Sequence, residues 1–118
     1  MSDDRVLLAH GGGGELTRRL IAEHIRPRLA NPALDELTDG ALLANPGGRV
    51  CVTTDASVVT PLFFPGGDIG RLAVSGTVND LAVMGATPLA LMQTLVIEEG
   101  LPLATLDRVL DSIAATAA

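Results

Sequence analysis

Residues 66–85 place the strongest constraint on the fold. They begin with the two glycines of a Pro-Gly-Gly turn and continue as a helix-length run of mostly small and apolar residues. Asp68 stands where an N-cap acceptor is expected, and residues 72–84 are small or apolar on nearly every face of the predicted helix. A helix that is apolar all round lies inside a protein. Asn79 and Asp80 interrupt its second half, where the helix dipole disfavours negative charge. We therefore expect Asp80 to be a buried carboxylate that needs an arginine, a hydrogen-bond network or a metal ion.

Amphipathic helices and strand-like segments surround this run. Helices are predicted over residues 15–29 and 103–118, and the second has an apolar stripe made of Leu106, Val109, Leu110 and Ile113. Strands are predicted over residues 5–9, 41–44, 49–54, 58–60 and 89–97, and the last of these is apolar on both faces. The order of elements predicts an α+β fold, with a mixed or antiparallel sheet and helices packed on one face.

The composition restricts the function further. The 118 residues suffice for one domain, 1–118, and the net charge of −6 with only two aromatic residues argues against nucleic-acid binding. No apolar run approaches the length of a membrane span, so we expect a soluble, cytoplasmic protein. Cys51 lies within a predicted strand, where we expect a small core residue and no nucleophile.

Four consecutive glycines, Gly11, Gly12, Gly13 and Gly14, follow the first predicted strand and precede a helix. Their backbone N–H groups could surround phosphate oxygens at the positive end of that helix. The spacing matches neither the P-loop nor the dinucleotide-binding fingerprint, so a mobile surface loop is the alternative. His10, directly before the glycines, is a structural or a phosphate-contacting residue.

Two aspartates are candidate metal ligands. Asp55 interrupts a predicted buried strand, and its alternative role is that of a turn former. Asp80 could instead pair with Arg71 or Arg49. If the two carboxylates lie on adjacent elements, they could coordinate Mg²⁺ while nucleotide phosphates complete the octahedron.

The motifs taken together resemble the hydrogenase maturation factor HypE family. The resemblance covers nearly the whole chain and rests on residues 10–14, 53–55, 63–70, 76–88 and 97–100. The element at residues 78–88 is also shared with aminoimidazole ribonucleotide synthetase, selenophosphate synthetase and thiamine-monophosphate kinase. The run at residues 63–70 and the glycine loop are what point to HypE.

The resemblance implies a specific activity. It implies a homodimer of two-domain subunits whose N-terminal sheets pair across the two-fold axis, as in the PurM-like fold. It also implies that ATP and Mg²⁺ are used to dehydrate a carbamoylated C-terminal cysteine to a thiocyanate, which supplies cyanide ligands for the iron of [NiFe] hydrogenases. The implied partners are the carbamoyltransferase HypF and the HypC–HypD complex.

The same resemblance assigns roles to residues of this chain. It makes Asp55 and Asp80 Mg²⁺ ligands and residues 11–14 a flap over the ATP phosphates, with support from Asp68, Asn79 and His10 in nucleotide binding.

The chain also departs from the family pattern. The family's C-terminal domain, its reactive terminal cysteine and a family lysine have no counterpart here, and all eight cationic residues are arginines. We therefore expect an N-terminal domain that is inactive alone but retains the dimer interface. The alternatives are another ATP-using enzyme of the superfamily, a small-molecule kinase or an amidine-forming ligase, and a non-catalytic dimerisation or docking module.

Overall fold

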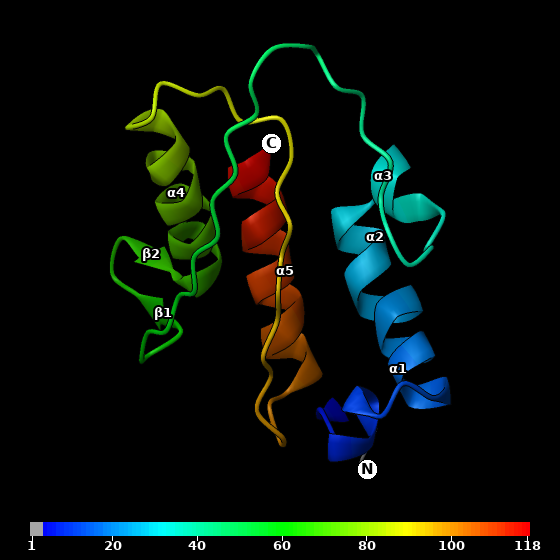
Figure 1. Cartoon of the computed structure of the whole chain (residues 1–118). Helices are drawn as coiled ribbons and strands as arrows, with labels where there is room; N and C mark the ends of the chain where they lie inside the picture. Colours follow the sequence, from blue (N-terminus) through cyan, green and yellow to red (C-terminus); the bar gives the residue numbers. More distant parts are fainter. Residues whose placement is uncertain (1–3) are drawn as a thin grey trace. The chain divides into compact units, whose positions relative to one another are not determined.

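The computed structural model describes residues 4–118, and the chain forms two compact units. The first contains the chain up to Ala44 together with Leu95–Asp111, and the second contains Asn45–Thr94 together with Ser112–Ala118. Figure 1 shows the elements along the chain, most of which are helices.

The helices, in chain order, are η2 (Leu8–Gly11, 3₁₀), α1 (Glu15–Leu20), η3 (Ile21–Ile25, a π-helix), α2 (Arg26–Leu29), α3 (Pro32–Asp35), α4 (Ile69–Ala82) and α5 (Leu103–Ala117). Two short strands, β1 (Phe63–Phe64) and β2 (Gly67–Asp68), pair antiparallel, with Phe63 opposite Asp68 and Phe64 opposite Gly67. The turn between them has Pro65 followed by Gly66 at φ 90°, which is the residue pattern of a type II turn.

The extensive sheet expected from the sequence is not present within residues 4–118, where β1 and β2 form the one two-stranded sheet. Residues 41–44, 49–54, 58–60 and 89–97 have no strand partner. The predicted strand 5–9 is reduced to a bridge between Arg5 and Pro102, after which η2 begins. The expected sheet was wrong for a single chain. A strand is stable only when a neighbouring strand pairs with it, and the apolar pattern of a segment does not show whether such a neighbour is present.

Residues 91–97 still show the two-residue period of a strand, whereas residues 41–44 and 49–52 are exposed at every position. From residue 91 to residue 97 the odd-numbered side chains are half-buried and the even-numbered ones are exposed, Met92 by 94% and Val96 by 99%. Val52 and Val58 are likewise 80% and 92% exposed. Cys51 is exposed as well, so its expected place in the core is wrong. Residues 91–97 therefore have an uncovered face that carries Met92 and Val96, and Val52 and Val58 add exposed apolar surface elsewhere.

The helix predicted over residues 15–29 is confirmed as the continuous series α1, η3 and α2. The π-turn at its centre contains His24, whose Nδ1 lies 2.7 Å from Asp107 Oδ1 of α5, and Arg28 Nη2 lies 3.1 Å from Asp107 Oδ2. The predicted stripe of α5 is confirmed too, because Leu106, Val109, Leu110 and Ile113 are all buried. Asn31 caps the short helix α3, which was not predicted from the sequence.

Helix α4 begins and ends at the residues that local chemistry favours. Asp68 Oδ1 accepts a hydrogen bond from Arg71 N at 3.0 Å, which confirms the predicted N-cap. At the other end Gly85 has φ 72°, while Gly85 N donates to Ala82 O and Ala86 N donates to Leu81 O, both at 3.0 Å. This pair of bonds is the Schellman motif, which requires a left-handed residue at the position of Gly85.

The expectation that α4 is buried on every face is wrong. Only Gly70 and Val74 of this helix are fully buried, Leu72 is 42% exposed, and Asn79 and Asp80 are exposed. An apolar run reveals how much apolar surface a helix carries, but the neighbours that cover it are set by packing elsewhere in the chain.

Replacing Leu110, whose side chain is 0% exposed, tests the core that α5 forms. We expect Leu110→Ala to lower the free energy of unfolding by about 2–5 kcal/mol, since it removes buried surface and leaves a cavity. Urea denaturation followed by circular dichroism measures this change. Leu8→Ala is the matched control, because Leu8 is 78% exposed and should change stability by less than about 0.5 kcal/mol. Equal losses in the two variants would contradict the assignment of Leu110 to the core.

Candidate nucleotide and metal site

Asp55 lies against helix α4. Its Oδ1 accepts a hydrogen bond from Ala56 N at 2.8 Å, while its Oδ2 would lie 3.6 Å from a Cβ built on Gly76. Gly76 and Asp80 are separated by one helical turn and therefore share a face of α4. The structure thus brings the Asp55 carboxylate to the stripe of α4 that carries Asp80.

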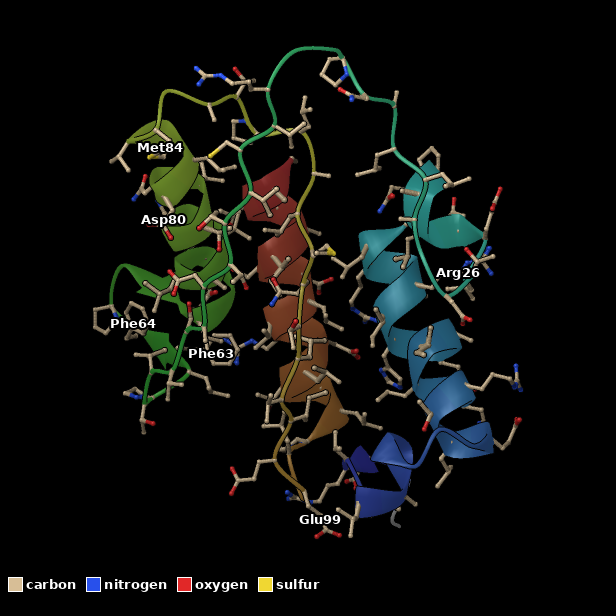
Figure 2. The ribbon with its side chains drawn as sticks, in the orientation of Figure 1. Arg26, Phe63, Phe64, Asp80, Met84 and Glu99 are labelled. Atoms are coloured by element: carbon tan, nitrogen blue, oxygen red, sulfur yellow. The ribbon has the colours of Figure 1, made fainter. Side chains whose placement is uncertain are left out.

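Asn79 and Asp80 occupy the last turn of α4 and face solvent. Figure 2 shows Asp80 and Met84 toward one end of α4 and the hairpin residues Phe63 and Phe64 toward the other. The expectation that Asp80 is a buried charge in need of a partner is therefore wrong. Within the described residues neither Arg49 nor Arg71 forms an ion pair with it, so the arginine alternative also fails.

Asp68 marks the opposite end of α4, twelve positions before Asp80, which corresponds to about 18 Å along a helix axis. Its Oδ1 accepts hydrogen bonds from Ser112 Oγ of α5 at 2.5 Å and from Arg71 N at 3.0 Å. The Ser112 hydroxyl, and to a lesser extent the backbone amides at the start of α4, hold the pKa of Asp68 below its usual value although partial burial opposes this. The structure therefore does not bring Asp68 together with Asp80.

A hollow of about 190 Å³ in the second unit also lies at the start of α4, away from Asp80. Its lining residues come from the hairpin and the first turns of the helix: Phe64, Gly66, Gly67, Asp68, Arg71, Leu72 and Ser75. The two candidate metal ligands are not among them. The hollow and the two carboxylates are therefore separate features of this unit.

The glycine loop belongs to the first unit and is held by a threonine. Gly13, at φ 78°, donates its N–H to Thr17 Oγ1 at 2.9 Å, and the Thr17 hydroxyl donates to the carbonyl of His10 at 2.6 Å. Gly14 then forms the N-cap of α1, and its carbonyl accepts from Arg18 N. Sequence reasoning missed Thr17, although a threonine in the first turn of a helix is a known signal for such a local hydrogen bond.

His10 has a structural contact in this unit. The N–H of Leu7 donates to its Nδ1 at 2.8 Å, closing the turn at η2. The ring also lines a small hollow of about 60 Å³, together with Leu7, Leu16, Arg19, Leu20, Glu23, His24 and Leu103. A structural role for His10 thus has direct support, and a phosphate contact stays a prediction.

Comparison with known proteins identifies the class. Residues 37–118 match the family described as AIR synthase related protein, N-terminal domain. The chain belongs to this family. Its similarity extends to proteins named carbamoyl dehydratase HypE: it is 50% identical over 117 residues to that of Rhodobacter capsulatus and 45% identical over 119 residues to that of Escherichia coli K12, in each case over 97% of this chain.

A solved structure supports the same relationship. The crystal structure of a hydrogenase maturation protein HypE in complex with ATP matches with a TM-score of 0.82 and 41% identity, over 94% of this chain and 33% of that one. The PurM-like N-terminal fold expected from the sequence is thus supported by this match. The chain spans about a third of the length of these relatives, with 34% for Rhodobacter capsulatus and 35% for Escherichia coli. In the part of the chain that the structure describes, no helix has both the length and the hydropathy needed to cross a membrane.

The cap at Asp68 can be tested by its pH dependence. The folded pKa of Asp68 lies below the ordinary value of 3.8, so its stabilising effect is complete above that value and is lost as the pH falls through the lowered pKa. We expect Asp68→Ala to lower the free energy of unfolding by about 1 kcal/mol at pH 7. The difference from wild type should shrink at pH 3 and below, as measured by urea denaturation.

Ser112→Ala is the companion variant, because it removes the donor from α5 and leaves the N-cap bond to Arg71 N intact. We expect a loss of about 0.5–1.5 kcal/mol from it. A loss from Asp68→Ala that stays constant between pH 7 and pH 2 would contradict the role given to the ionised carboxylate.

Proposed function

We propose that this chain is the N-terminal, nucleotide-binding part of a carbamoyl dehydratase of the HypE type. The observation that carries the proposal is the similarity over nearly the whole chain to proteins of that name, one of which was solved with ATP. In the proposed reaction ATP phosphorylates the amide oxygen of a carbamoylated cysteine. Loss of phosphate then leaves a thiocyanate, the source of cyanide for the iron of [NiFe] hydrogenases.

The proposed Mg²⁺ ligands are Asp55 and Asp80. Their carboxylates suit this ion because it binds hard oxygen atoms and takes one or two carboxylates from the protein, with phosphates and waters completing its shell. Asp80 is exposed and has no arginine partner, and Asp55 Oδ2 lies against the same stripe of α4. When bound, the ion would neutralise charge on the nucleotide phosphates.

The remaining proposed contacts to ATP come from the glycine loop. Residues 11–14 are exposed beside the N-terminal end of α1, where the helix dipole favours phosphate. The amides of Gly12 and Gly13 donate to Ala9 O and Thr17 Oγ1, so a phosphate would have to replace these two bonds to use them. Asn79, exposed next to Asp80 in the chain, and Asp68 at the opposite end of α4 are proposed to support nucleotide binding, Asp68 by fixing where the helix begins. We propose that the rest of the protein supplies the reactive cysteine and the lysine that the resemblance implies, since this chain contains no lysine.

We further propose that two copies pair through the unpaired apolar segments. Val52, Val58, Met92 and Val96 are exposed apolar side chains of those segments, and residues 91–97 alternate with the period of a strand. Strands of a second copy would cover these side chains and satisfy the backbone groups, which matches the sheet pairing implied by the resemblance. HypF and the HypC–HypD complex remain the proposed partners of the whole protein.

Titration calorimetry with ATP and Mg²⁺ tests the metal ligands. We expect Asp80→Asn and Asp55→Asn each to weaken Mg²⁺-dependent ATP binding by about tenfold or more, because each removes a charged oxygen ligand. Asp39→Asn, which neutralises an exposed aspartate in the first unit, should bind like wild type. If binding is unchanged in both site variants, the metal role of the two carboxylates is excluded, whereas a wild type that does not bind ATP would favour a non-catalytic dimerisation module.

Sedimentation velocity tests the proposed pairing. We expect the wild-type chain to be dimeric and Met92→Glu to be monomeric, since the variant would bury an unpaired charge in the apolar face. Leu8→Glu is the control: Leu8 is 78% exposed but lies in η2, outside the unpaired segments. A monomeric wild type, or a Met92→Glu variant that still dimerises, would contradict the proposed interface.

A further inference from the structure

Gly76 stands in the interior of α4, where glycine is an unfavourable residue. Backbone conformation does not explain its presence, because Gly76 is not among the glycines with positive φ. Close packing of another helix does not explain it either. A Cβ built at this position meets only one atom within 4 Å, Asp55 Oδ2 at 3.6 Å.

From this contact we infer that Gly76 is a positioning residue for the proposed metal site. A small residue at this position leaves room for the Asp55 carboxylate directly on the surface of α4, and a longer side chain would enter that space. This inference rests on the proposed function, in which Asp55 and Asp80 share a Mg²⁺ ion.

Helix geometry shows why position 76 matters and not its neighbours. Side chains of an α-helix lean toward the N-terminus, so a residue covers the surface over the turn before its own Cα. For Asp80 the preceding turn on the same face is the one at Gly76. The Asp55 carboxylate lies beside Gly76, one turn before Asp80 on the same face of α4, which is where an ion shared by the two carboxylates would bind.

The contact distance predicts which substitutions are tolerated. A separation of 3.6 Å between Cβ and Oδ2 is an ordinary van der Waals contact, so an alanine fits beside Asp55. The further carbons of a leucine would have to enter the space that the carboxylate fills. Alanine and leucine have similar helix propensities, so a comparison of the two variants separates the effect of side-chain size from the effect on helix stability.

The test is a Mg²⁺ titration at fixed ATP concentration, followed by calorimetry, on wild type, Gly76→Ala and Gly76→Leu. We expect Gly76→Ala to keep wild-type Mg²⁺ affinity and Gly76→Leu to lose about 10–100-fold, as when a residue that orients a metal ligand is changed. Ala82→Leu adds bulk at an exposed position of the same helix and should leave the affinity unchanged. Thermal unfolding of all variants reports stability separately.

The outcomes separate this inference from the proposed function. In an Asp55→Asn background, Gly76→Leu should cause no further loss, because both changes act on one group. Equal Mg²⁺ affinity in Gly76→Leu and wild type would overturn the inference while leaving the proposed function standing. The inference is also overturned if Gly76→Ala weakens Mg²⁺ binding as much as Gly76→Leu does. It is overturned as well if Gly76→Leu lowers the thermal stability and leaves the Mg²⁺ affinity unchanged. Absence of Mg²⁺-dependent ATP binding in wild type would instead overturn the proposed function and this inference with it.

Discussion

The second unit depends on the carboxylate of Asp68. This residue ends the hairpin by pairing opposite Phe63, caps α4 through Arg71 N, and accepts the hydroxyl of Ser112 from α5. The first N–H groups of a helix have no partner within the helix. An ionised carboxylate at this end therefore stabilises the helix both by accepting a hydrogen bond and by its favourable interaction with the helix dipole. Because the turn, the cap and the contact to α5 meet at one residue, Asp68 sets where α4 begins and hence where its later turns carry Gly76 and Asp80.

The candidate metal site lies at the exposed C-terminal end of α4. The Schellman motif at Gly85 stops α4 one turn beyond Asp80, and the carboxylates of Asp55 and Asp80 stay exposed. An exposed carboxylate needs no partner for its stability, which leaves its oxygens available to a ligand. In the first unit Thr17 holds the glycine loop in one arrangement, so a phosphate would meet amides that are already ordered in part.

Much of the local structure follows from neighbouring residues and could be predicted. The cap at Asp68, the stripe of α5 and the helix over residues 15–29 each depend on contacts within a few positions, or on a helical period that a single segment displays. The site was less predictable. Ser112 is 44 positions from Asp68 in the chain, and nothing in the local pattern joins Asp55 to Gly76. The expected burial of Asp80 was wrong, while the family motifs that pointed to the same residue do not depend on its burial.

The sequence by itself determined the cap at which α4 begins, the apolar face of α5 and the family to which the chain belongs, because a cap, a helical period and a motif each depend on residues close together in the chain. Only the tertiary structure decided that the strand-like segments stay unpaired within one chain and that α4 carries its carboxylates on an exposed face. Pairing and burial depend on what other segments approach, and that is a property of the folded chain in space.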